Sequence, residues 1–239
     1  KKNKGGNFEY PRCTIIVAPV SVMANWQMEI DKFVHAKEKN ILKVAIYQGS
    51  RRDRTLDKVQ HASLDVLICS YQTLAADFKI YKKKEEEMRE KMDSSNVEDS
   101  METYDESSSI FEVLFHRIIL DEAHNIRNAS TGVFKAAKKL QSMHKLALTG
   151  TPFVNHPKDI HSLLSFLEVE PLDTVDNYNH FVVDPILQRK EVGLARLRVV
   201  IGALAIRRTK QGKISCSRLI FKILRKMRLT SSLFLLLEY

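Results

Sequence analysis

Two neighbouring carboxylates end an apolar run, and their chemistry is the most definite in the chain. Residues 115–120 are largely apolar, which predicts a buried strand that delivers Asp121 and Glu122 at its carboxyl end. Ligands of open α/β sheets bind at that end of the strands. An aspartate there can hold Mg²⁺ through water, and an adjacent glutamate can deprotonate the water that attacks a phosphate. For these two residues alone, an Asp-Glu pair that merely starts a turn is the competing interpretation.

A Thr-Gly-Thr turn follows the next apolar run and supports the chemical interpretation. Residues 145–148 predict a strand that continues into Thr149, Gly150 and Thr151. The hydroxyls and backbone amides of such a turn could lie beside the carboxylates and couple a nucleotide site to a bound chain. Two such motifs on successive strands are far less often a coincidence than either one alone.

The first apolar run leads into a helix start that suits a phosphate. Residues 14–18 predict a buried strand, Pro19 ends it, and Ser21 can cap a helix that runs to about residue 34. Exposed amides and the positive end of the helix dipole favour the phosphate of a nucleic-acid backbone. We interpret Trp26, on the apolar face of this helix, as a core anchor rather than a platform for base stacking.

Strands and helices alternate around these motifs, which predicts a parallel α/β sheet. The expected strands are 14–18, 43–47, 66–70, 115–120 and 145–149. The expected helices begin at residues 21, 131 and 157, with a short helix from residue 71, a basic one near 52–61 and a helical segment over 187–206.

The segment 79–109 interrupts this order. It is so densely charged that it cannot supply a core. We expect a surface insertion, one charged helix followed by a disordered loop, and a solvated spacer is its simplest role.

The composition excludes several classes of protein. With 44% hydrophobic and 28% charged residues among 239, the chain has the usage of an ordinary globular domain. It contains no run of about 18 apolar residues, so we expect no membrane-spanning helix. Cys13, Cys69 and Cys216 lack the spacing of a zinc or disulfide framework, which fits a reducing compartment.

The net charge of +9 comes from the C-terminal part of the chain. Residues 187–239 hold 13 of the 38 Lys and Arg and only two of the 29 acids, which leaves 25 bases and 27 acids in the first 186 residues. The basic total therefore identifies no nucleic-acid surface on the main domain. The basic tail is either a DNA-binding arm or a merely solvated or out-of-frame segment.

Together the motifs resemble those of superfamily-two helicase-like ATPases, and more closely the Swi/Snf family. They occur in the order of the family's motifs Ia, II and III, and the Asn25–Trp26 pair belongs to the first. The matching segments are 15–26, 66–71, 121–128, 148–155 and 206–210. The stretch from Glu168 to Pro185 is similar to the subgroup that includes the helicase-like transcription factor and the RING-bearing repair ATPases.

The resemblance implies a RecA-like three-layer α/β sandwich with a mostly parallel sheet, incomplete in this chain. A charged insertion and a helical C-terminal extension add to it. The implied parts are an N-terminal loop remnant (1–13), the first ATPase lobe (14–186, with the insertion at 79–109), a helical extension toward a second lobe (187–212) and a basic tail of unclear structure (213–239).

The family's chemistry implies ATP and Mg²⁺ as cofactors. By resemblance Asp121 binds Mg²⁺, Glu122 activates water and both contact the nucleotide, while His124 links motif II to motif III. Thr149, Gly150 and Thr151 would couple the nucleotide site to DNA.

The family's partner is double-stranded DNA, contacted through its backbone without sequence specificity. The contacts would come from Pro19, Ser21, Ser70, Thr149 and Thr151. Nucleosomes or other DNA-bound proteins are further partners that the resemblance allows, in chromatin remodelling or DNA repair, and the expected location is the nucleus.

Two departures from the family pattern limit the expected activity. The residues around Lys4, Gly5 and Gly6 are not a GxxxxGK[ST] phosphate loop, and no second lobe with an arginine finger follows. We therefore expect the chain to begin after its phosphate loop and to hydrolyse ATP negligibly by itself. The alternative is a lobe that has lost ATPase function and only binds DNA or protein.

Overall fold

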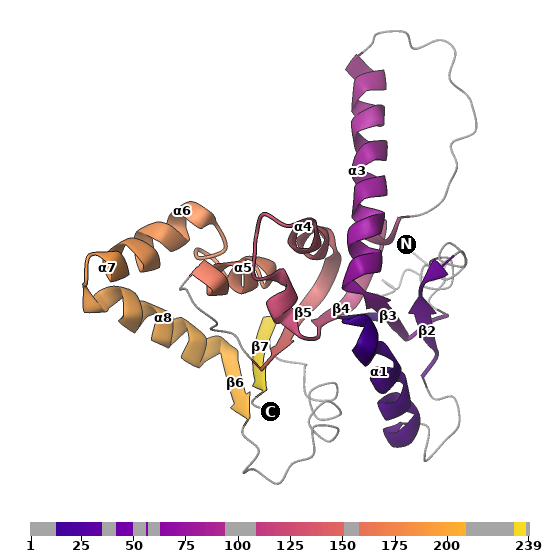
Figure 1. Cartoon of the computed structure of the whole chain (residues 1–239), viewed down its shortest axis with the longest axis horizontal. Helices are drawn as coiled ribbons and strands as arrows, with labels where there is room; N and C mark the ends of the chain where they lie inside the picture. The colour runs from indigo at the N-terminus through magenta and orange to yellow at the C-terminus, as the bar shows by residue number, and fades with distance from the viewer. Residues whose placement is uncertain are drawn as a thin grey trace, which may run out of the picture.

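The computed structural model describes residues 13–34, 42–49, 56, 63–93, 109–150, 158–208 and 232–237. Within these ranges seven strands form one sheet in the order β2-β3-β1-β4-β5-β7-β6, and every neighbouring pair is parallel (Figure 1). The strands are β1 (Thr14–Ala18), β2 (Val44–Tyr47), β3 (Val66–Ser70), β4 (Leu114–Leu120), β5 (Gln141–Thr149), β6 (Ala205–Arg208) and β7 (Ser232–Leu237). The five strands expected from the sequence are therefore confirmed as β1 to β5.

Helices connect the strands and cover both faces of the sheet. The α-helices are α1 (Val20–Phe33), α3 (Tyr71–Asp93), α4 (Gly132–Lys139), α5 (Lys158–Phe166), α6 (Val175–Tyr178), α7 (Asp184–Leu187) and α8 (Glu191–Leu204). The 3₁₀ segments are η2 (Ile110–Glu112) and η3 (Ala123–Ile126), and η4 (Asn179–Val183) is a π-helical segment between α6 and α7.

The alternation of side chains along the strands separates two cores. On one face the sheet packs against Met23 and Trp26 of α1. On the other face it packs against buried side chains of α3, α4 and α5, including Leu74, Phe134 and Leu163. The sheet is thus buried on both sides, which explains why its central strands are continuous apolar runs.

The register of the sheet brings the carboxyl ends of four strands to one edge. Ala18 lies opposite Ser70, Val17 lies opposite Leu120, and Leu120 lies opposite Ala147. Residues that follow these positions therefore meet at the same edge, although they are up to about 130 positions apart in the chain.

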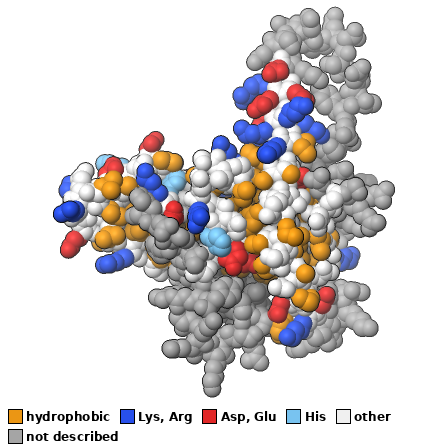
Figure 2. Space-filling view, viewed as in Figure 1, with side chains coloured by type: hydrophobic (Ala, Val, Ile, Leu, Met, Phe, Trp, Pro, Cys, Tyr) orange, Lys and Arg blue, Asp and Glu red, His pale blue; other side chains and the backbone are white. Residues whose placement is uncertain are grey.

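Helix α3 is much longer than the short helix expected from residue 71. It runs for 23 residues to Asp93 and projects beyond the sheet (Figure 1). Only its first part is buried, through Leu74 and Phe78, whereas Lys and Glu side chains cover its projecting part (Figure 2). The start of the charged segment 79–109 is therefore the end of this helix, and residues 94–108 lie outside the described ranges.

Two helix starts show how local sequence sets the boundaries. Thr131 caps α4 as its position predicts, because its hydroxyl accepts a hydrogen bond from the Phe134 amide at 3.3 Å. The expected cap at Ser21 is wrong, since α1 already begins at Val20 and Pro19 precedes it without a side-chain cap bond. Ser21 instead lies exposed in the first turn of the helix.

The C-terminal helices form a third core with α5. Tyr178, Val182 and Leu197 are buried there with Ile160 and Leu164. The helical segment expected over 187–206 is confirmed for α8, which ends at Leu204, but Ala205 and Ile206 belong to β6 instead. The segment 213–239 had no predicted structure, and its residues 232–237 form β7 beside β5.

Some expectations fall on residues that the structure does not describe. They include the N-terminal remnant to residue 12 and, apart from Leu56, the basic helix near 52–61. Among the described residues, no helix has the length and apolar character needed to cross a membrane.

Two glycines of α8 provide a matched test of the third core. A methyl group at Gly193 would lie 2.7 Å from the Val182 carbonyl oxygen and 2.9 Å from Ile186 Cγ1, whereas nothing lies within 4 Å at Gly202. Gly193→Ala should therefore lower the free energy of unfolding by about 1–3 kcal/mol through overpacking. Gly202→Ala should raise it by up to about 1 kcal/mol, because alanine is the better helix former. Urea denaturation of both variants measures the two signs, and a stabilising Gly193→Ala would contradict this packing.

Candidate functional site

Asp121 is fixed at the carboxyl end of β4. Its backbone N–H donates to the Val17 carbonyl at 2.8 Å, which extends the pairing of β4 with β1 past the last strand residue. Its side chain points to the face that α1 covers, as does that of Ile119 two positions earlier. The residue is only 7% exposed, so an ionisable carboxyl group is buried at the edge of the sheet.

Two N–H groups hold the Asp121 carboxylate. The Trp26 indole Nε1–H donates to Oδ2 at 2.7 Å, and the Glu122 backbone N–H donates to Oδ1 at 2.9 Å. Trp26 lies in the core between α1 and the sheet, so its interpretation as a core anchor is confirmed. The sequence analysis missed its second contact, although a buried indole N–H needs an acceptor and so gave a signal.

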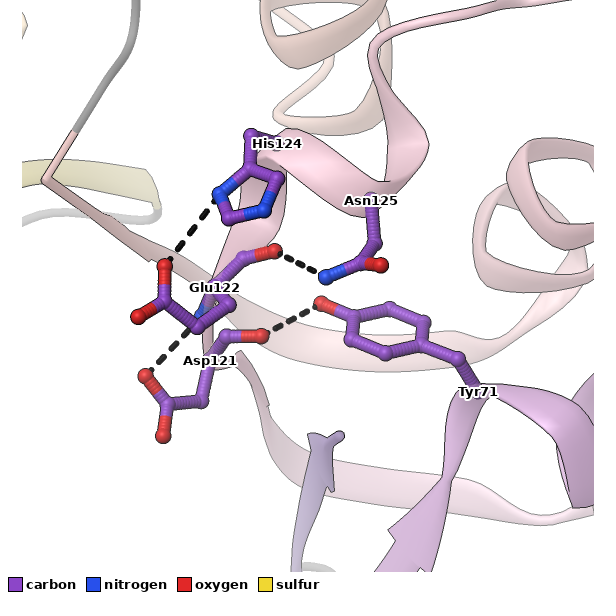
Figure 3. A network of polar contacts seen from close by, with 5 residues as sticks. All are labelled: Tyr71, Asp121, Glu122, His124 and Asn125. Atoms are coloured by element: carbon purple, nitrogen blue, oxygen red, sulfur yellow. Dashed lines mark hydrogen bonds and ion pairs between the residues drawn. The ribbon is translucent and has the colours of Figure 1, made fainter. Parts of the chain in front are cut away.

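Tyr71 holds the same aspartate from the opposite face of the sheet. Its hydroxyl donates to the Asp121 backbone carbonyl at 2.8 Å (Figure 3). Tyr71 is the first residue of α3 and belongs to the core on the α3 face. Asp121 therefore has hydrogen-bond partners above and below the sheet, in addition to its strand pairing.

Burial and hydrogen bonding act in opposite directions on the ionisation of these groups. Burial raises the pKa of the Asp121 carboxyl above its ordinary value, and the hydrogen bonds from Trp26 and the Glu122 amide lower it in part. Burial, and then the nearby charges of Asp121 and Glu122, hold the pKa of Tyr71 well above 10. Its hydroxyl therefore stays protonated and remains a donor at neutral pH.

Glu122 adopts a left-handed backbone conformation, with φ of 49° and ψ of 51°. A non-glycine residue there costs roughly 1–3 kcal/mol, so the surrounding structure must hold it. Asn125 does so from within the same turn, because its Nδ2 donates to the Glu122 carbonyl at 2.7 Å and its backbone N–H donates at 3.0 Å (Figure 3). The strained turn re-aims the Glu122 side chain away from the path of the strand.

His124 lies beside the Glu122 carboxylate. Its Nδ1 is 3.2 Å from Glu122 Oε2, but the geometry is not that of a hydrogen bond, so the contact is an ion pair only when the imidazole is protonated. Both side chains remain partly exposed, at 37% for His124 and 29% for Glu122. In contrast to Asp121, these two groups can reach solvent or a ligand.

The other predicted site residues lie at the same edge with unequal access. Ser21 is exposed and Pro19 is half-buried, whereas Ser70 and Thr149 are buried. The Ser70 hydroxyl accepts the Thr73 amide at 3.0 Å and so caps the start of α3. Gly150 directly follows the end of β5, and Thr151 lies outside the described residues.

A metal at this edge would need ligands besides protein side chains. The described residues hold no cluster of three or more His, Cys, Asp or Glu side chains that could bind a metal ion by themselves. Asp121 and Glu122 do suit Mg²⁺, which proteins commonly bind with one or two carboxylates, waters and the phosphates of a substrate. The two carboxylates therefore fit a cation whose remaining ligands are waters or phosphate oxygens.

Comparison with known sequences decides the family. A sequence model of the SNF2-related domain matches residues 2–228. The chain belongs to the SNF2-related domain family. The resemblance to Swi/Snf ATPases drawn from the motifs is thereby confirmed, and the match includes part of the segment 213–239.

Curated relatives of this SNF2-related domain include repair proteins and helicase-like factors. It is 33% identical over 213 residues to the DNA repair protein RAD5 of Cryptococcus neoformans, covering 88% of this chain and 16% of the relative. It is 32% identical over 207 residues to the helicase-like transcription factor of Mus musculus, covering 86% and 18%. The chain thus spans about a sixth of the length of the curated relatives that it matches.

A solved structure of an SNF2 protein confirms the fold class. The SWI2/SNF2 ATPase core of Sulfolobus solfataricus, solved in complex with double-stranded DNA, matches with a TM-score of 0.61 and 26% identity. The match covers 85% of this SNF2-related domain and 35% of the solved chain. A second structure of the Sulfolobus solfataricus SWI2/SNF2 ATPase core domain matches with a TM-score of 0.57 and 26% identity. The α/β fold with a parallel sheet is therefore that of the SWI2/SNF2 ATPase core.

The buried Asp121 predicts a pH dependence of stability. Because its pKa is higher in the folded than in the unfolded chain, the folded state binds the extra proton, and stability falls as pH rises from about 3.8 through the raised folded pKa. As the pH rises through this window, the melting temperature of the wild type should therefore fall relative to that of Asp121→Asn. Thermal melts of both proteins in a series of buffers from pH 3.5 to 7.5 measure it, and a constant difference would contradict the raised pKa.

Proposed function

We propose that this chain is the first motor lobe of an ATP-driven translocase that moves along duplex DNA and remodels protein–DNA complexes. The observation that carries the proposal is the Asp121–Glu122 pair at the carboxyl edge of a parallel sheet in an SNF2-related domain. Its relatives support the setting, because they are named for DNA repair and helicase-like function, and one related core was solved with double-stranded DNA.

In this proposal Asp121 and Glu122 divide the work on ATP. Mg²⁺ bound to ATP would neutralise phosphate charge, and the buried carboxylate of Asp121, with its orientation fixed by two N–H donors, would hold that cation. Glu122 is partly exposed, so its carboxylate can orient the attacking water and accept its proton. His124 lies beside Glu122 and, when protonated, would stabilise the negative charge of that carboxylate. It would also link Glu122 to the end of β5.

The start of α1 is the part of this edge that suits the DNA backbone. Its first two residues, Val20 and Ser21, are exposed, and no side chain caps the start of the helix. A phosphate can accept from the amides of such a helix start and gains from the helix dipole. Contacts of this kind position a strand without reading its sequence, as a translocase requires. The same proposal places the protein in the nucleus, where it would act in DNA repair or chromatin remodelling.

The 239 residues by themselves should not turn over ATP. They contain no GxxxxGK[ST] loop to cradle the phosphates, so the Asp121–Glu122 pair lacks a partner for the nucleotide. Phosphate release from ATP and Mg²⁺ should therefore equal the buffer background, with or without duplex DNA. Turnover above background that Glu122→Gln abolishes would refute this expectation and show a complete active site.

Duplex DNA binding is the direct test of the proposed function. The fluorescence anisotropy of a labelled 20-base-pair duplex should rise as the chain is added. The affinity should fall steeply with salt concentration and should not depend on the DNA sequence. Ser21→Glu should weaken binding roughly 3- to 10-fold by placing a negative charge against the phosphate. The substitution should not weaken the helix itself, because an acid in the first turn favours it.

Gln27→Glu is the matched control, because it adds the same charge on an exposed position of the same helix, more than a turn further on. It should change the affinity by less than twofold. Binding that Ser21→Glu and Gln27→Glu weaken equally, or no binding at low salt, would contradict the proposed contact.

A further inference from the structure

Both side-chain hydrogen bonds that hold Asp121 from outside its own turn come from helices that start at the same edge. Trp26 belongs to α1, which begins directly after β1 and carries Ser21 in its first turn. Tyr71 is the first residue of α3 and directly follows Ser70 at the end of β3. The Asp121 carboxyl group is thus hydrogen-bonded to the helix that follows β1, and the Asp121 backbone carbonyl to the helix that follows β3.

We propose that Trp26 and Tyr71 are positioning residues that couple DNA contact at the start of α1, and the packing of the start of α3, to the orientation of Asp121. This inference rests on the proposed function and adds how DNA would regulate the metal-binding carboxylate. Trp26 acts from the α1 face of the sheet and Tyr71 from the α3 face, so a shift of either helix start changes the hydrogen bonding of the same aspartate.

The physical basis is that each link is short and stiff. Trp26 follows Ser21 by five residues, about 7.5 Å along a rigid helix, so a displaced helix start displaces the indole. The Tyr71 hydroxyl is attached to the residue next to Ser70, whose side chain caps α3 through the Thr73 amide. The four residues that form these links are at least nine-tenths buried, so their side chains have little room to move. They are Trp26, Ser70, Tyr71 and Asp121.

A purely structural role is the competing explanation, and the chain offers a matched control for it. Tyr47 is also buried and donates its hydroxyl to an aspartate, at 2.7 Å to Asp77 Oδ2, and β3 and β1 separate its strand β2 from β4. Tyr47→Phe and Tyr71→Phe remove the same atom from comparable surroundings. Only Tyr71→Phe should alter the effect of DNA on metal binding at Asp121.

The test measures Mn²⁺ binding to the full chain with and without a saturating 20-base-pair duplex. Free Mn²⁺ is followed by electron paramagnetic resonance, and subtraction of Asp121→Asn isolates the Asp121 site. The duplex should change the Mn²⁺ affinity of the wild type about fivefold or more, as coupled sites commonly show. Trp26→Phe and Tyr71→Phe should each bring this ratio close to one, while Tyr47→Phe keeps it, and thermal melts verify that every variant is folded.

The outcomes separate the inference from the function on which it rests. If no duplex binds, or if Asp121→Asn leaves Mn²⁺ binding unchanged, the proposed function fails and the coupling fails with it. If both ligands bind but the duplex leaves the Mn²⁺ affinity unchanged, only the coupling is overturned. A ratio that survives both Trp26→Phe and Tyr71→Phe would likewise overturn it.

Discussion

The burial of one carboxyl group, Asp121, constrains the rest of this edge of the molecule. A charge removed from water is expensive unless donors replace the lost solvent, and each hydrogen bond to a charged group contributes about 1.5–3 kcal/mol. Here the Trp26 indole and the Glu122 amide supply those donors. The sheet must therefore keep β1, α1 and β4 in one register, or the carboxylate would lose its partners.

The same constraint explains why the two neighbouring acids differ so strongly. Asp121 is turned toward the core and locked, whereas Glu122 is turned outward by a left-handed backbone conformation that Asn125 stabilises. A group that holds a cation benefits from fixed geometry, and a group that moves a proton needs access to water. One strand end thus produces two carboxylates suited to different parts of phosphate hydrolysis.

The sequence predicted the sheet and the place of the site well, because both depend on local patterns. Continuous apolar runs identified β1 to β5, and the polar residues that end them identified the functional edge. Helix α3 was underestimated because its projecting part has no apolar stripe, and it relies on charged helix formers such as the Lys83–Glu87 pair, 3.6 Å apart. The links from Trp26 and Tyr71 to Asp121 span 95 and 50 positions, so no local pattern could show them.

The most direct measurement of this account uses the single tryptophan of the chain. In the ¹⁵N-labelled protein, Trp26 gives the one indole N–H signal, and its hydrogen bond to Asp121 should make that proton slow to exchange with solvent. In Asp121→Ala the signal should move upfield and the exchange should become at least tenfold faster, while the backbone signals of β1 and β4 persist. An indole signal whose position and exchange rate are the same in both proteins would contradict the hydrogen bond on which this account of the site depends.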